Sequence, residues 1–246
     1  MRPPPPASPA WRDEKRVRSH SESWHVVDLP IFDYREALDL QHRILAARVS
    51  GSLPFNVVLL LEHPPVFTLG RRGGRENLLV PEDRLSARGI AIVPIERGGD
   101  ITYHGPGQLV IYVIMALREG NLSVTGLVSG LEQVMVAAAA RWGLDASGNE
   151  TYRGAWIGRR KLGSIGITIR RGVSFHGLAL NVNTDLEPFS WINPCGIQGC
   201  SMTSLAREIG GPVDMAAARR EALSSLASIF ELHLEPIDVD KLERLR

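Results

Sequence analysis

The segment Val57–Leu61 is an unbroken run of valine and leucine, and it constrains the fold of this 246-residue chain more than any other feature. A strand that is apolar at every position has no polar face to turn toward water, so both of its faces must be covered. The run is also far shorter than the roughly 18–20 apolar residues needed to cross a bilayer. It therefore predicts a strand covered on both faces in a soluble protein.

Helical and extended patterns alternate along the rest of the chain. Amphipathic helices are predicted over Asp33–Val49, Leu122–Trp142 and Asp214–Phe230, with Asp33 and Asp214 as N-caps and Gly143 ending the second helix. Helices interleaved with short strands and hairpins predict a single domain of the α+β or mixed α/β class. Further strands are predicted at Trp24–Leu29, Ile90–Ile95, Leu109–Ile114, Ala155–Ile157, Ser164–Ile169 and Phe175–Val182, with a loop over Glu96–Gln108 and a tight turn at Arg171–Gly172.

Charge balance and composition exclude several classes of protein. The 28 lysines and arginines stand against 27 aspartates and glutamates, so the formal net charge of +1 lacks the basic excess of a nucleic-acid binder. Hydrophobic residues at 44% and charged residues at 22% are ordinary globular values. In residues 1–22, five prolines and a cluster of charges predict a disordered tail, without the apolar stretch of a secretion signal. We expect a cytoplasmic protein whose two cysteines are reduced.

Arg97–Gln108 is the first of three glycine-dense segments that carry the functional signal. Its four glycines let the backbone approach a ligand closely and turn its N–H groups inward. The segment has neither the Gly-x-Gly-x-x-Gly spacing nor the Gly-Lys-Ser/Thr ending of nucleotide-binding loops, so a phosphate cradle is not indicated. Taken alone, it fits either a ligand-binding loop or a plain hairpin connection.

Lys161 and Cys195 stand in the other two glycine-dense segments, Arg159–Gly166 and Asn193–Cys200. Lys161 precedes an apolar, glycine-spaced strand, so it is either buried beside a partner or a surface lysine in a basic turn. Cys195 lies between a proline and a glycine, which fits either a nucleophile presented in a rigid, exposed turn or a small buried residue. A metal site is disfavoured, because four residues separate the two cysteines and no second pair exists.

Taken in order, these segments resemble the motifs of the octanoyltransferases of lipoate synthesis. The resemblance runs from about Trp24 to about Phe230, and its many spaced matches make it highly specific. Val113 departs from the family pattern, Cys200 is not a motif residue, and the tail before Trp24 is extra. The matching segments are Leu61–Arg72, Arg97–Leu109, Lys161–Gly166, His176–Val182, Asp185–Leu186, Pro194–Gly196 and Thr203–Leu205.

The resemblance implies a lipoyl(octanoyl) transferase whose catalytic domain spans residues 23–246. Such an enzyme moves octanoate from the phosphopantetheine thioester of acyl carrier protein to a lysine of a lipoyl domain, in 2-oxoacid dehydrogenase complexes or glycine cleavage H protein. The implied fold resembles the catalytic domain of lipoate and biotin ligases, a mixed sheet flanked by helices. No cofactor, metal, nucleic acid or membrane is implied.

By match to the motifs, Cys195 is the acyl-accepting nucleophile and Lys161 is the residue that lowers the pKa of its thiol. The same match implies substrate-binding roles for Arg97, Gly98, Gly99, Asp100, Ile101, Thr102, Tyr103, His104, Ser164, Ile165, Gly166, Gly177, Leu178 and Ala179.

Physical chemistry adds a second role for Lys161. A thiol with a pKa of about 8.5 is about 3% thiolate at pH 7. Lowering that pKa by about two units gives only about a threefold gain in attack, because nucleophilicity falls with basicity. We therefore expect Lys161 to move protons as well, protonating the leaving thiol and later deprotonating the incoming amine.

Other side chains receive supporting roles. His104 and His176 are alternative catalytic bases, but we expect them to position the substrate instead. We expect Asp185 to cap or brace the loop before Cys195. Backbone N–H groups of the Cys195–Gly196 turn are candidate donors to the thioester oxyanion. Apolar residues near Leu162, Ile165 and Leu178 are expected to line the acyl slot, and Arg71 and Arg72 to meet carboxylates of the carrier protein.

Competing functions are distinguished by simple tests. An ATP-dependent lipoate ligase on the same fold would have no need of Cys195, and its transfer would require ATP. A non-catalytic module that docks acyl carrier protein would form no covalent acyl intermediate. A cysteine protease or thioesterase is disfavoured, because no Cys–His–Asn order at family spacing is evident.

Overall fold

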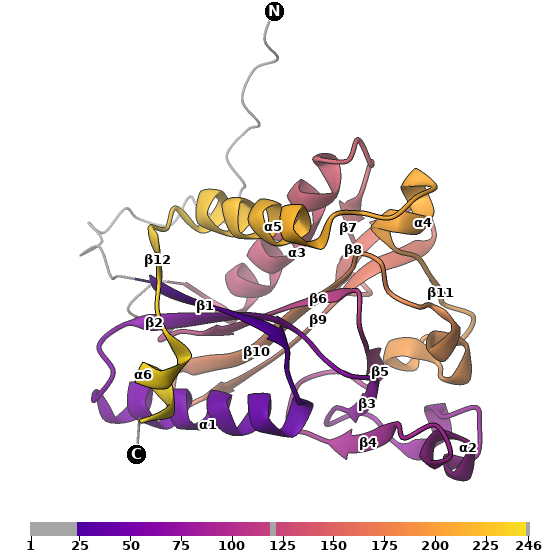
Figure 1. Ribbon diagram of the computed structural model, residues 1–246, viewed down its shortest axis with the longest axis horizontal. Coiled ribbons are helices and arrows are strands. Elements are labelled where there is room, and N and C mark those ends of the chain that lie inside the picture. The colour runs from indigo at the N-terminus through magenta and orange to yellow at the C-terminus, as the bar shows by residue number, and fades with distance from the viewer. Residues whose placement is uncertain (1–23, 119–121, 245–246) are drawn as a thin grey trace, which may run out of the picture.

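A mixed sheet of nine strands forms the centre of the structure (Figure 1). The computed structural model describes residues 24–118 and 122–244, so the predicted tail over residues 1–22 lies outside the described residues. β1 is parallel to both of its neighbours, whereas the strands from β2 to β7 along the sheet are antiparallel. In spatial order they are β12 (Leu234–Pro236), β1 (Trp24–Ile31), β2 (Asn56–Glu62), β6 (Gln108–Ile114), β10 (Val173–Asn181), β9 (Arg160–Arg170), β8 (Gly154–Ile157) and β7 (Ser147–Gly148), with β11 (Ser201–Met202) beside β9.

The apolar run lies in β2, near the middle of this sheet. Its alternate side chains Val57, Leu59 and Leu61 pack on one face with α1 (Tyr34–Ser50) and α6 (Val239–Glu243). Val58 and Leu60 pack on the other face with α3 (Val124–Ala140) and α5 (Met215–Phe230). Figure 1 shows these two helical layers on opposite sides of the sheet. The structure thus confirms the prediction of a mixed sheet flanked by helices.

Capping side chains fix where the long helices begin. The Asp33 carboxylate accepts hydrogen bonds from the backbone N–H groups of the first turn of α1, and Asp214 does the same for α5, as predicted. α3 begins slightly later than predicted, because the Ser123 hydroxyl caps it by accepting from the Gly126 N–H. It ends at Ala140, and the chain leaves the helix through Gly143, whose φ of 72° suits glycine.

The predicted loop over Glu96–Gln108 is wrong in its middle, where the chain forms β5 (Ile101–His104). β5 pairs with β3 (Val66–Leu69), which also pairs with β4 (Ala91–Pro94), and α2 (Glu82–Ser86) packs beside this small sheet. Side chains alternate along β5, so Ile101 and Tyr103 enter a third apolar core. Sequence pattern missed the strand because it is only four residues long and has glycines on both sides.

The β9–β10 hairpin brings Lys161 toward the segment that contains Cys195. Arg171 and Gly172 have φ values of 50° and 83°, as the central residues of a type I′ turn require, so the predicted tight turn is confirmed. Because β9 begins at Arg160, Lys161 belongs to a strand and not to a turn. β11 pairs in parallel with the start of β9, which holds the chain that follows Cys195 close to Lys161.

Short turns complete the region between β10 and α5. They are η3 (Glu187–Trp191), η4 (Pro194–Gly196) and α4 (Leu205–Ile209), while η2 (Arg75–Asn77) precedes α2. The Asp185 carboxylate accepts a 3.0 Å hydrogen bond from the Glu187 N–H, which braces η3 and agrees with the role expected for it. No helix within residues 24–118 and 122–244 combines the length and apolar character required for a membrane span.

Candidate active site

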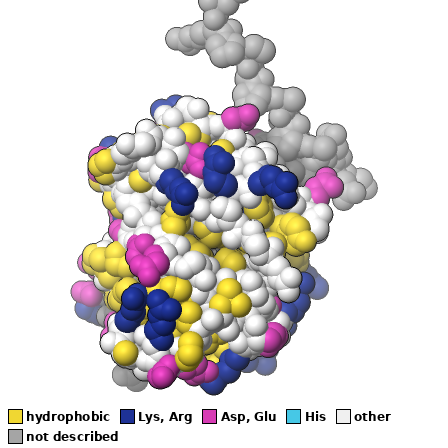
Figure 2. All heavy atoms as spheres, turned by 90° about the vertical axis from the view of Figure 1, so that its right-hand side faces the viewer, with side chains coloured by type: hydrophobic (Ala, Val, Ile, Leu, Met, Phe, Trp, Pro, Cys, Tyr) yellow, Lys and Arg dark blue, Asp and Glu magenta, His cyan; other side chains and the backbone are white. Residues whose placement is uncertain are grey.

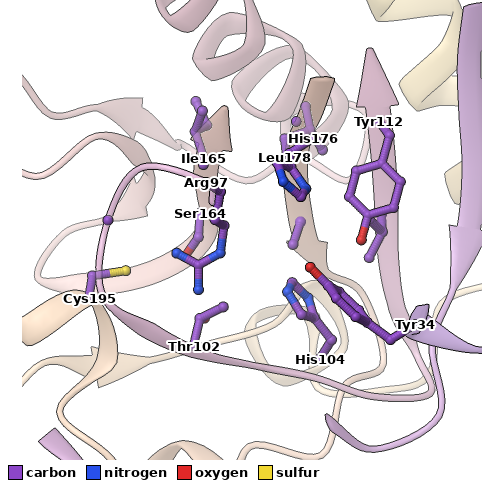
Figure 3. A pocket seen from close by; sticks show the side chains of 15 residues that line it. Tyr34, Arg97, Thr102, His104, Tyr112, Ser164, Ile165, His176, Leu178 and Cys195 are labelled. Atoms are coloured by element: carbon purple, nitrogen blue, oxygen red, sulfur yellow. The ribbon is translucent and has the colours of Figure 1, made fainter. Parts of the chain in front are cut away.

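A pocket opens between the two sheets, and most of the predicted substrate-binding residues line it (Figure 3). Figure 2 shows the face of the molecule that carries this region, where apolar side chains gather in a hollow and lysine or arginine side chains border it. Three further lining residues, two of them tyrosines, were not predicted. The lining comprises Arg97, Gly99, Thr102, His104, Ser164, Ile165, Gly166, His176, Gly177, Leu178, Ala179 and Cys195 from the prediction, with Tyr34, Val110 and Tyr112 in addition.

Cys195 and Lys161 meet at this pocket. The Lys161 Nζ lies 3.7 Å from the Cys195 Sγ, within hydrogen-bond reach of a sulfur atom. Cys195 is half-buried in η4, so it is less exposed than the predicted turn implied. Its φ of 57° is a left-handed conformation that non-glycine residues rarely adopt, and Gly196 beside it has a φ of 70°. Such backbone strain is common where a reactive side chain is held in place.

Lys161 is buried, with an exposed fraction of 1%, so the alternative of a surface lysine is wrong. Its Nζ donates a 3.0 Å hydrogen bond to the Arg153 carbonyl and lies 5.1 Å from the centre of the Trp156 ring. The side chain points inward because β9 continues through residue 161, which spacing alone did not reveal.

The second cysteine has a different environment. Cys200 is half-buried, and burial raises the pKa of its thiol. Its Sγ lies 4.0 Å from the Met202 Sδ. Burial therefore disfavours the thiolate form of Cys200.

Arg97 places a buried guanidinium beside the pocket, pointing into the space between Cys195 and His104 (Figure 3). Its two terminal nitrogens donate to Gly98 and Thr68, whereas its buried Nε has no hydrogen-bond partner within the described part of the chain. Burial lowers the pKa of this group, but arginine remains charged in proteins. The guanidinium is thus a fixed positive charge near the thiol.

Two buried histidines line the pocket farther from Cys195 (Figure 3). Burial lowers the pKa of His104 to about 3, with a smaller contribution from nearby His63. Burial also lowers the pKa of His176 to about 3, and within the described residues neither of its ring nitrogens has a hydrogen-bond partner. His104 Nδ1 lies 2.6 Å from the Gln108 Oε1. Both rings are neutral at pH 7, which suits positioning better than carrying charge.

The remaining predicted residues support the pocket instead of lining it. The Asp100 carboxylate accepts from Asn77 Nδ2 at 2.8 Å, and a Cβ added at Gly196 would lie 2.9 Å from Asp100, so Asp100 abuts the Cys195 turn. The Gly98 N–H donates to the Ile167 carbonyl at 3.1 Å. Ile101 and Tyr103 face the third core, as the alternation of β5 dictates.

Two of the secondary expectations need correction. Leu162 is fully buried in the core beneath α3 and does not line the pocket, whereas Ile165 and Leu178 do. The Gly196 N–H donates to the Asn193 carbonyl at 2.9 Å, so it is already engaged and is not free to hold an oxyanion. Turn geometry within η4 uses this N–H, a detail that sequence spacing does not reveal.

The comparisons with known proteins first define a class. Residues 33–227 match the family model described as the lipoyl protein ligase A/B catalytic domain. A putative lipoate protein ligase from T. acidophilum superposes with a TM-score of 0.70 at 16% identity, covering 92% of each chain. A lipoate-protein ligase A bound with ATP gives a TM-score of 0.70 at 17% identity, also covering 92% of each chain. These structures share the fold of this class.

Curated relatives narrow the class to one family. An octanoyltransferase from Desulfotalea psychrophila is 51% identical over 207 residues, which is 83% of this chain and 93% of that protein. One from Syntrophobacter fumaroxidans is 41% identical over 220 residues, covering 89% of this chain and 96% of that protein. The chain belongs to the octanoyltransferase family and is an acyltransferase.

Proposed function

We propose that this chain transfers an octanoyl group from acyl carrier protein to a lysine of a lipoyl domain, through a thioester on Cys195. The observation that carries the proposal is the 3.7 Å contact between the Lys161 Nζ and the Cys195 Sγ at a partly apolar pocket. The acceptors are the lipoyl domains of 2-oxoacid dehydrogenase complexes and the glycine cleavage H protein, in the cytoplasm. Exposed Arg71 and Arg72 are candidate contacts for the carrier protein.

In the first step the Cys195 thiolate attacks the thioester carbonyl of the carrier protein. The Sγ–C bond forms, the bond from carbon to the phosphopantetheine sulfur breaks, and the Lys161 ammonium gives a proton to the leaving thiolate. Because one thioester replaces another, the exchange is close to energetic balance.

In the second step the amine of the acceptor lysine attacks the acyl group on Cys195. The C–N bond forms, the Sγ–C bond breaks, and the neutral Lys161 amine takes the proton that the nitrogen loses. The ammonium and the thiolate are then restored together. Amide formation from a thioester is downhill, so the cycle needs no ATP.

Ile165 and Leu178 form an apolar wall of the pocket for the octanoyl chain, and Gly177 lines the same pocket. A Cβ added at Gly166 would lie 2.8 Å from the Arg97 Cδ, so glycine is needed there to leave room for the guanidinium. Since the Gly196 N–H is engaged, Arg97 and the Cys195 N–H are the candidate groups to stabilise the oxyanion of each step.

The test is transfer with purified components in the absence of ATP. Octanoyl-acyl carrier protein, a lipoyl domain and the enzyme are mixed, and the intact mass of the lipoyl domain is followed by mass spectrometry. We expect one octanoyl group on the domain, and none when its target lysine is replaced by alanine. Modification that requires ATP and free octanoate would instead indicate a ligase, and complex formation without modification would indicate a binding module.

A further inference from the structure

Glu132 is a buried carboxylate in the middle of α3, and the reaction described above makes no use of it. Its exposed fraction is 5%, and it lies between the apolar core, to which Leu131 and Met135 belong, and a surface cavity lined by Gln133 and Glu150. A carboxylate buried in such surroundings is costly unless hydrogen bonds satisfy it. Its Oε1 accepts a 2.7 Å bond from the Gly154 N–H, and its Oε2 accepts a 2.9 Å bond from the Arg153 Nη1.

The Gly154 N–H and the Arg153 carbonyl are the two ends of one peptide group. The carbonyl end accepts the 3.0 Å hydrogen bond from the Lys161 Nζ, and that nitrogen contacts the Cys195 Sγ. A continuous path of hydrogen bonds therefore runs from Glu132, across one peptide group, to Lys161 and the thiol. An oxygen that holds the N–H end of the peptide group therefore also fixes the direction of its carbonyl end.

This peptide group lies at the start of β8, because Arg153 precedes the strand and Gly154 is its first residue. Gly154 has a φ of 137°, and a Cβ there would lie 2.3 Å from the Gly163 carbonyl oxygen and 3.0 Å from the Lys161 Cε. The register between β8 and β9 also shifts just after it, between Ala155 and Trp156. Ordinary ladder pairing thus does not fix the direction of the Arg153 carbonyl, and the bond to Glu132 supplies the constraint.

We propose that Glu132 is a positioning residue for Lys161, acting through the Arg153–Gly154 peptide group. By holding the N–H end, it aims the carbonyl at the Lys161 Nζ and keeps the ammonium within reach of Cys195. The Arg153 guanidinium contributes little, because it is half-exposed and its own carbonyl remains when the side chain is removed. This inference rests on the proposed function of the Lys161–Cys195 pair.

Two small substitutions at Glu132 distinguish the position of its side-chain oxygens from their negative charge. Glu132→Gln keeps a side-chain oxygen at the same distance from the Gly154 N–H but removes the charge. Glu132→Asp keeps the charge but draws the oxygens back by one methylene. If positioning is the role, Glu132→Gln acylates Cys195 within about threefold of the wild-type rate, whereas Glu132→Asp is slower by about tenfold to a hundredfold, the size expected for a displacement of about 1 Å. The loss appears in kcat and not in KM, because Glu132 does not line the substrate pocket.

The measurement uses the full chain carrying Cys200→Ala, so that Cys195 is its one thiol. Single-turnover acylation by octanoyl-acyl carrier protein and alkylation by iodoacetamide are both followed. Glu150→Gln is the matched control, because Glu150 lines the same surface cavity but is exposed and is expected to leave both rates unchanged. Glu132→Asp should slow alkylation as well as acylation. In a Lys161→Met background it should not slow alkylation, since the residue through which it acts is gone.

Three results would each overturn the inference. Glu132→Asp could be as fast as the control, Glu132→Gln could be slower than Glu132→Asp, or the effect of Glu132→Asp on alkylation could persist without Lys161. Wild-type enzyme that takes up no octanoyl group on Cys195 would overturn the proposed function instead. Wild-type acylation together with any of the three preceding results would leave that function standing.

Discussion

Replacing Lys161 with methionine should stabilise the protein while it abolishes activity. The ammonium has an exposed fraction of 1%, and its hydrogen-bond partners are a neutral carbonyl and a thiol, neither of them a carboxylate. Replacing a buried ion pair by apolar side chains of similar volume is often neutral or stabilising by about 1–4 kcal/mol, because the cost of desolvating the charges is removed. Because neither partner is a carboxylate, the substitution leaves no buried carboxylate without its cation. We expect a gain of about 1–3 kcal/mol, a rise in Tm of roughly 2–10 °C for a chain of this size.

The same variant should lose octanoyl transfer by 10²–10⁴-fold, as expected for removal of a general acid–base group. If the ammonium only favoured the thiolate, the loss would be about threefold and raising the pH to about 8.5 would largely restore the rate. Lys161→Arg should fail as well, because a guanidinium keeps the charge but releases no proton at accessible pH.

The assays are urea unfolding and single-turnover kinetics on wild type, Lys161→Met and Lys161→Arg. A methionine variant that is less stable than wild type would refute the argument from buried charge. Near-normal transfer by the arginine variant would refute proton transfer and leave Lys161 as a fixed charge.

Two further predictions concern stability and the tail. Burial lowers the pKa of His176 to about 3, so between about pH 6.5 and pH 3 the unfolded chain binds a proton that the native state does not. Through its protonation, the unfolding free energy should therefore fall by about 1.4 kcal/mol for each unit that the pH drops through that window. His176→Asn should remove this part of the slope in urea titrations, because asparagine tolerates the φ of 59° at this position. An unchanged slope would contradict the attribution to His176. A chain that begins near Ser21 should keep full transfer activity with purified partners, and a loss of more than a few-fold would show that the tail contacts the core or a substrate.

Local sequence signals were sufficient to predict a central strand of the sheet and the starts of two long helices. The run Val57–Leu61 predicted a strand covered on both faces, and Asp33 and Asp214 marked two helix starts, because an apolar stripe and a capping carboxylate act within a few residues. β5 was missed because its stability comes from pairing with β3 and packing on Phe67, both distant in sequence.

The active site was predictable only in part, for the same reason. Cys195 and Lys161 stood out through motif resemblance, but the burial of Lys161 depends on where β9 begins. Tyr34 and Tyr112 reach the pocket from α1 and β6, and no motif links them to it. Glu132 carries no local signal at all, since an isolated glutamate in a helix ordinarily faces solvent.

Acylation of Cys195 is the most direct test of the central claim. The enzyme is incubated with octanoyl-acyl carrier protein alone, digested, and analysed by peptide mass spectrometry. We predict one hydroxylamine-labile octanoyl group on the peptide that contains Pro194 and Cys195, present in Cys200→Ala and absent in Cys195→Ala. Addition of a lipoyl domain should then move the group to the acceptor lysine. An octanoyl group on Cys200, or on neither cysteine while transfer still occurs, would contradict the two-step mechanism.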